Sequence, residues 1–197
     1  MKLPKEFYRG SDTIAIAKKL LGKLLVTNFE GQYTSGIITE TEAYCGVEDR
    51  GSHAHNGRCT KRTAIMYESG GVSYVYLCYG IHCLFNVVTH IKNEPHAILI
   101  RAIQPVDGIE IMLERTGKNK FTPQLASGPG LVAQCLGIQL QHNGIDLTSD
   151  KICIEEYKTN SFKIIESARV GMNFDGLYKT IPWRFRIAGS KYTSKAK

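Results

Sequence analysis

The sequence predicts an α+β fold, a single mixed domain over residues 1–197 built on a curved, mainly antiparallel β-sheet with surrounding helices. Three observations lead to this prediction. Short runs rich in β-branched and aromatic residues recur along the chain, and turn residues separate them. Apolar residues at helical spacing lie between some of these runs. The length of 197 residues, with no break in composition and no internal repeat, suits one well-buried domain.

The helices follow from capping residues and apolar spacing. Asp12 can cap a helix whose apolar residues recur at helical intervals and which Gly22 ends. The turn Ser127-Gly128-Pro129-Gly130 leads into another helix. The expected helices are residues 14–21, 106–116 and 131–136, with a short helix near 64–67.

The strands follow from β-branched and aromatic runs. Glu30-Gly31-Gln32 is a hairpin turn between the first two strands. The run over residues 97–103 is almost entirely apolar up to Arg101, which indicates a strand that is buried on both faces. The polar segment 45–69 is a long loop, and loops of that length are usually functional or disordered. The basic, polar residues 190–197 are expected to fray. The expected strands are residues 24–28, 33–41, 72–80, 84–89, 97–103, 152–156 and 162–166.

Composition narrows the class of protein. The net charge of +7 and the isoelectric point near 9.1 favour an anionic partner, nucleic acid above all, although charge alone does not distinguish this from an ordinary basic protein. The six cysteines never form a CxxC pair, so a disulfide framework or a zinc ribbon is not expected. No segment resembles a membrane span or a signal peptide, and we expect a cytoplasmic protein.

The run Ile37–Tyr44 carries the first functional signal. Glu40 and Glu42 are two residues apart on a strand, so both side chains point to one face. Glu42 is either a solvated glutamate at a strand end or a general base whose pKa the apolar surroundings tune. A glycosidase that uses Glu40 and Glu42 together stays open, because spacing on one strand does not fix their separation.

Aromatic and basic residues gather near this run. Tyr44, Tyr74, Tyr76 and Tyr79 cannot all be core residues unless four buried hydroxyl groups find partners, so some are expected to face a cleft. Flat aromatic walls suit a nucleobase, and a positively charged base best. The basic residues Arg58 and Arg62, with Lys118 and Lys120 further on, are candidates for DNA-backbone contacts.

A set of motifs in collinear order carries a family resemblance. The motifs are Thr39-Glu40-Thr41-Glu42-Ala43-Tyr44, Glu48-Asp49, His53, residues 74–80, Asn86, Leu99, Arg101, Ser127-Gly128-Pro129-Gly130, Arg169-Val170-Gly171 and Pro182-Trp183-Arg184-Phe185. Together they resemble the alkyladenine (3-methyladenine) DNA glycosylase family over nearly the whole chain. The sequence departs from the family at Leu131, where many relatives carry a lysine, and at His82 and Arg186, where aromatic residues are common.

The resemblance implies a reaction and a role for each matched residue. Glu42 falls on the general base that activates the attacking water, Arg101 on a position linked to that water, and Tyr79 on the wedge that enters the duplex. Six residues fall on the pocket for the flipped base: Tyr44, His53 and Tyr76 as its walls, Asn86 and Leu99 as positions that exclude guanine, and Val170 as lining.

The implied enzyme is a monomeric, monofunctional glycosylase without metal or cofactor. Its expected substrate is double-stranded DNA with a damaged purine, namely 3-methyladenine, 7-methylguanine, hypoxanthine or ethenoadenine, and its product is an abasic site. Two alternatives remain. A non-catalytic nucleic-acid-binding module would use Tyr76 and Tyr79 only for stacking. A metal-dependent nuclease would use His53, His55 and Asp49.

Overall fold

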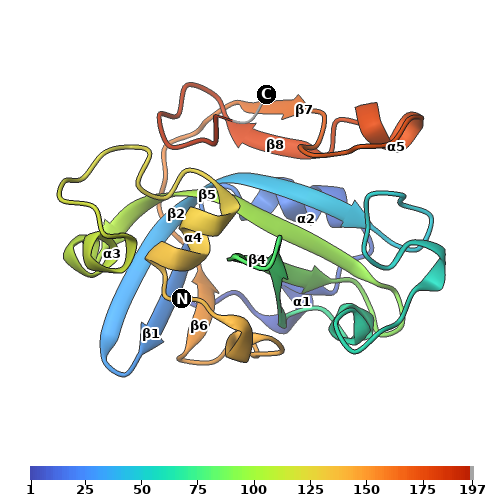
Figure 1. Cartoon of the computed structure of the whole chain (residues 1–197), viewed down its shortest axis with the longest axis horizontal. Coiled ribbons are helices and arrows are strands. Elements are labelled where there is room, and N and C mark those ends of the chain that lie inside the picture. Colours follow the sequence, from blue (N-terminus) through green and yellow to red (C-terminus); the bar gives the residue numbers. More distant parts are fainter. Residues whose placement is uncertain (196–197) are drawn as a thin grey trace.

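The computed structural model describes residues 1–195, which form one antiparallel sheet with helices on its faces (Figure 1). The strands are β1 Leu24–Phe29, β2 Gln32–Cys45, β3 Ser73–Cys78, β4 His82–Thr89, β5 His96–Asp107, β6 Ile152–Glu155, β7 Ile164–Ser167 and β8 Arg184–Ile187. The α-helices are α1 Lys5–Tyr8, α2 Thr13–Leu20, α3 Ile109–Thr116, α4 Pro129–Cys135 and α5 Leu177–Thr180, with 3-10 turns at His55–Gly57, Ala64–Tyr67 and Leu140–His142. The predicted α+β class is confirmed.

Strand β2 is the centre of the sheet. The strands follow the order β3-β4-β5-β2-β1-β6, and β8 pairs with both β2 and β7. One edge of β2 pairs with β5. The other edge pairs with β1 at residues 32–37 and then with β8 at residues 40–42. Glu40 and Glu42 are therefore flanked by a strand on each side, and both are fully buried.

The pairing of β2 with β5 is irregular at the carboxylates. Ile38 pairs with Ile103 and Glu40 with Ala102, but Thr41 pairs with Ile100, so the register shifts on both sides of Glu40. Arg101 falls within this irregularity. Bulges of this kind bend a strand and redirect a side chain, and they are frequent beside active sites.

Helices cover the sheet and close the core. Helix α2 lies against β2, where the hydroxyl of Thr41 donates a hydrogen bond to the carbonyl of Ala17 at 3.0 Å. The expected cap of α2 is confirmed, since the Asp12 side chain accepts a hydrogen bond from the Ala15 N–H at 2.9 Å. Helix α4 packs against β4 and β5. Within residues 1–195, no helix combines the length and the apolar character needed to cross a membrane.

Strand β5 is longer than predicted. We expected it to end at residue 103 and a helix to begin at 106, but the strand continues to Asp107 and α3 begins at Ile109. Pro105 suggested a break. It is accommodated opposite Gly36, next to a register shift, where a missing backbone N–H is tolerated. The short helix α1 was missed, because four residues are too few to show a period.

The expectation of a frayed tail is wrong for most of residues 190–197. Ser194 is buried, and its backbone N–H donates to Oε2 of Glu40 at 2.6 Å. The carbonyl of Tyr192 accepts a hydrogen bond from the Thr39 hydroxyl at 2.7 Å. The tail is fixed because it supplies partners to a buried carboxylate. Ala196 and Lys197 lie outside the described residues.

Candidate active site

Eight residues predicted for the site come together around one cavity of about 420 Å³, a size typical of small-ligand sites. They are Tyr44, His53, Tyr76, Tyr79, Asn86, Leu99, Arg101 and Val170. Strands β2, β3, β4 and β5 supply most of them, and the segment after β7 supplies Val170. Arg50, Met172 and Phe174 also line the cavity, and sequence reasoning missed them because they lie in loops without a recognisable pattern.

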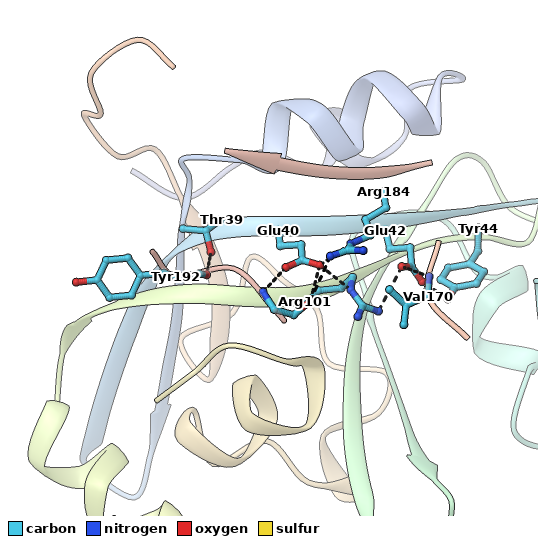
Figure 2. A network of polar contacts seen from close by, with 9 residues as sticks. Thr39, Glu40, Glu42, Tyr44, Arg101, Val170, Arg184 and Tyr192 are labelled. Carbon is cyan, nitrogen blue, oxygen red and sulfur yellow. Dashed lines mark hydrogen bonds and ion pairs between the residues drawn. The ribbon is translucent and has the colours of Figure 1, made fainter. Parts of the chain in front are cut away.

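Glu42 does not itself line the cavity, but it contacts three residues that do, Tyr44, Arg101 and Val170 (Figure 2). Its Oε1 accepts a hydrogen bond from the Tyr44 hydroxyl at 2.5 Å, and its Oε2 accepts one from the Val170 N–H at 3.1 Å. Arg101 Nη1 lies 3.3 Å from Oε2. Tyr44, Val170 and Arg101 all line the cavity, so three of its wall groups fix the orientation of one carboxylate. The alternative of a solvated glutamate at a strand end is wrong.

Glu40 has a structural environment. Its Oε1 accepts hydrogen bonds from Arg101 Nε at 2.9 Å and Arg184 Nε at 2.8 Å, and Ser194 donates to both of its oxygens. Burial acts to raise the pKa of Glu40, but the Ser194 N–H and the two guanidinium groups outweigh it and lower the pKa. A carboxylate held ionised in this way is a poor general acid, so the geometry does not support a two-carboxylate glycosidase.

Arg101 bridges the two carboxylates, which confirms that Glu40 and Glu42 share a face of β2. Burial acts to lower the pKa of Arg101, but the negative charges of Glu42 and Glu40 outweigh it and raise the pKa. Burial and the neighbouring Glu42 raise the pKa of Tyr44 well above its usual value. Tyr44 therefore stays protonated at neutral pH and acts as a hydrogen-bond donor.

A buried ion pair between Asp49 and Arg169 holds the same wall from behind. Arg169 Nη1 and Nη2 each contact one oxygen of Asp49 at 2.6 Å, and both side chains are fully buried. The guanidinium also lies 4.9 Å from the Tyr44 ring centre and 5.3 Å from the Trp183 ring centre. Because Arg169 directly precedes Val170, this pair positions two of the groups that bond Glu42.

The aromatic wall is an ordered cluster. His53 Nδ1 lies 2.8 Å from the Tyr74 hydroxyl, and the His53 and Tyr76 rings meet edge to face at 4.6 Å. Asn86 Nδ2 donates to the Tyr74 carbonyl at 3.1 Å and lies opposite Leu99 on β5. Burial, assisted by Arg62 and Arg58, lowers the pKa of His53 to about 4. His53 is therefore neutral at pH 7 and does not repel a cationic base.

Tyr79 stands at the exposed tip of the β3–β4 hairpin, and 89% of its surface is accessible. The Ile81 N–H bonds the Cys78 carbonyl at 3.1 Å, and Tyr79 and Gly80 both have positive φ (51° and 70°), as a type I′ turn requires. Asn, Asp or Gly is usual at the first of these positions. An exposed tyrosine there, at the mouth of the cavity, contributes nothing to the core.

The candidate backbone contacts lie near the surface. Arg58, Arg62 and Lys120 are exposed, and Lys118 is half-buried. Their contacts with DNA stay a prediction. The metal-nuclease alternative loses its site, since Asp49 is bound to Arg169, His53 faces Tyr74, and His55 Nδ1 lies 2.9 Å from the Val47 carbonyl.

The sequence profile of the methylpurine-DNA glycosylase family matches residues 6–191. The chain belongs to this family. Membership identifies it as a DNA glycosylase of alkylated-purine repair, a hydrolase of N-glycosyl bonds that acts on DNA, and confirms the resemblance read from the motifs.

Proteins from several bacteria are similar over their full length, and each is named "Putative 3-methyladenine DNA glycosylase". The protein of Chlamydia felis is 48% identical over 94% of this chain and 95% of its own length. The protein of Clostridium acetobutylicum is 44% identical over 100% of this chain and 99% of its own length. The protein of Desulfitobacterium hafniense is 40% identical over 98% of this chain and 98% of its own length.

Proposed function

We propose that this glycosylase flips alkylated or deaminated purines out of duplex DNA and hydrolyses the N-glycosidic bond with a water that Glu42 activates. The observation that carries the proposal is the triply bonded carboxylate behind an aromatic cavity. The cavity holds Tyr76 and His53 for stacking and Asn86 for polar contact with a base edge. The proposed substrates are 3-methyladenine, 7-methylguanine, hypoxanthine and ethenoadenine.

Glu42 has two roles in this mechanism. Its negative charge stabilises the oxocarbenium-like sugar in the transition state, and it accepts the proton of the attacking water as the C1′–O bond forms. The departing purine takes the electrons of the glycosidic bond. Tyr44 and Val170 hold the carboxylate so that it need not reorganise during the reaction, and Arg101 Nη1 lies 3.3 Å from its Oε2.

The exposed tip and the neutral wall support base flipping. We propose that the exposed Tyr79 enters the base stack and fills the gap that the extruded nucleotide leaves. A methylated purine carries a positive charge, which the faces of Tyr76 and His53 attract while His53 stays neutral. Arg58, Arg62, Lys118 and Lys120 are proposed to contact the DNA backbone, which would make binding depend strongly on salt.

A monofunctional reaction is proposed, because none of the described residues that line the cavity is a lysine that could form a Schiff base. The product is then an abasic site without strand cleavage. We propose that the protein acts as a cytoplasmic monomer on double-stranded DNA. The chemistry assigned to Glu42, Arg101 and the cavity uses no metal.

The test is release of base from a duplex with one hypoxanthine and from alkylated DNA, in EDTA, with the undamaged duplex as control. The proposal predicts that free purine appears and that strand breaks appear only after alkali. Release of base from alkylated DNA alone would still support a glycosylase but would remove hypoxanthine from its proposed substrates. Tight, salt-sensitive binding without release would favour the non-catalytic stacking module and refute the proposal.

A further inference from the structure

A second group of polar side chains lies in the turn between β4 and β5, away from the cavity. His90, Glu94 and His96 each offer a ligand atom, and these atoms lie within 4.8 Å of one another. The two imidazole rings stack at 4.5 Å with an interplanar angle of 15°. Among the described residues, no other three His, Cys, Asp or Glu side chains approach this closely.

His90 has a ring nitrogen available for a ligand bond. Its Nδ1 is buried, and no hydrogen-bond partner for it exists among residues 1–195. A buried polar atom without a partner is costly, and the turn holds His90 in the left-handed region at φ 75°, which residues other than glycine adopt rarely. The nitrogen gains a partner if it binds something that the described chain does not supply.

His96 is oriented as a metal-binding histidine. Its Nδ1 lies 3.0 Å from the Thr13 hydroxyl, which in turn lies 3.2 Å from the Thr89 hydroxyl. Histidines that bind metals generally donate the second ring N–H to such a partner, which fixes the tautomer and leaves Nε2 for the ion. Gly46 keeps the space beside Nε2 open, because a Cβ there would lie 3.2 Å from it.

The third group completes the donor set. Glu94 is exposed, and its carboxylate makes no hydrogen bond or ion pair with any other part of the described chain. Two imidazoles and one carboxylate, with solvent access for a water, form a donor set that suits zinc.

We propose that His90, Glu94 and His96 bind one zinc ion, with water as the fourth ligand. Metal–ligand bonds of about 2.0–2.2 Å bring ligand atoms to about 3.3 Å from each other, so binding requires small side-chain rotations from the 4.8 Å cluster. The ion ties the β4–β5 turn together beside the start of the loop at Gly46. His96 pairs with Cys45, which lies three residues, or about 10 Å of backbone, along β2 from Glu42 and points to the opposite face of the strand, so the proposed ion is separate from the reacting carboxylate.

The proposed ion is structural, and its test does not depend on catalysis. The metal-free full-length protein is titrated with Zn²⁺ by calorimetry and with Co²⁺ by visible absorption, and its melting temperature is recorded with and without Zn²⁺. We expect one equivalent to bind, the absorption bands of four-coordinate cobalt, and a higher melting temperature with zinc. Base release from damaged DNA in EDTA is expected to persist, so this proposal and the proposed function fail separately.

Matched variants assign the site. Glu94→Gln and His90→Gln are each expected to weaken zinc binding by about tenfold or more and to abolish the rise in melting temperature that zinc causes. Glu94 is exposed, so its variant is expected to fold. Glu110→Gln removes an exposed carboxylate from α3, and Cys59→Ser removes the exposed thiol; neither is expected to change the affinity. No stoichiometric binding, unchanged affinity in Glu94→Gln, or loss of binding in Cys59→Ser would overturn the proposal.

Discussion

The ion pair between Asp49 and Arg169 gives a quantitative prediction about the rear of the site. Asp49→Asn keeps the size of the side chain and one oxygen to accept from either the Cys45 or the Gly51 N–H, but removes the charge and the second acceptor. The Arg169 guanidinium then stays fully buried without its counter-charge. Breaking one partner of a buried pair typically costs about 3–5 kcal/mol, a large share of a total stability of about 5–15 kcal/mol.

The assay is equilibrium unfolding in urea, followed by the fluorescence of the only tryptophan, Trp183, which lies against Arg169. Glu166→Gln breaks the exposed pair with Lys18 and serves as the control, with an expected loss below about 1 kcal/mol. The double variant Asp49→Asn/Arg169→Met is expected to lose less than the sum of the single changes, because no buried charge is left unpaired. A loss below about 1 kcal/mol in Asp49→Asn would refute the assigned role.

Three further predictions concern the cavity. Tyr44→Phe keeps the ring but deletes the 2.5 Å bond to Glu42, so single-turnover base release is expected to fall about ten- to a hundredfold; an unchanged rate would contradict the orienting role. Tyr79→Ala is expected to slow base release from duplex DNA about tenfold more than base release from single-stranded DNA, and Ile81→Ala, which also changes an exposed residue, is the control. Equal loss of rate on the two substrates would count against the wedge role of Tyr79. The folded-state pKa of His53 is depressed to about 4, so the stability that its neutral form provides is present above about pH 6.5 and is lost as the pH falls toward 4. The urea midpoint is therefore expected to change less across this pH range in His53→Gln than in wild type. The same dependence of the midpoint on pH in both proteins would be evidence against burial of the neutral ring.

The arrangement of site residues that are close to one another in the chain could be predicted from the sequence. The two-residue spacing of Glu40 and Glu42 on a strand put both on one face, and Arg101 contacts both carboxylates, as that placement requires. Patterns with a period of two or 3.6 residues report such local geometry well. Tyr79 was expected inside a strand over residues 72–80, but β3 ends at Cys78 and Tyr79 lies in the turn that follows.

The long-range part was not visible in the sequence. The partners of Glu40 include Ser194, 154 residues away in a tail that composition marked as frayed, and Asp49 is 120 residues from Arg169. No local pattern encodes such pairs, since only the closed sheet brings the segments together. Arg101 is redirected by a register shift between β2 and β5, and a shift depends on both strands.

The most direct test of the central claim compares Glu42→Gln with wild type in single-turnover release of base from a damaged duplex. Glutamine can accept the Val170 N–H with its amide oxygen and donate its amide N–H to the Tyr44 hydroxyl oxygen, so the pocket is expected to keep its shape. We expect the rate to fall by about a hundredfold to ten-thousandfold, while affinity for the damaged duplex changes by less than about threefold. A rate within about threefold of wild type would contradict Glu42 as the general base.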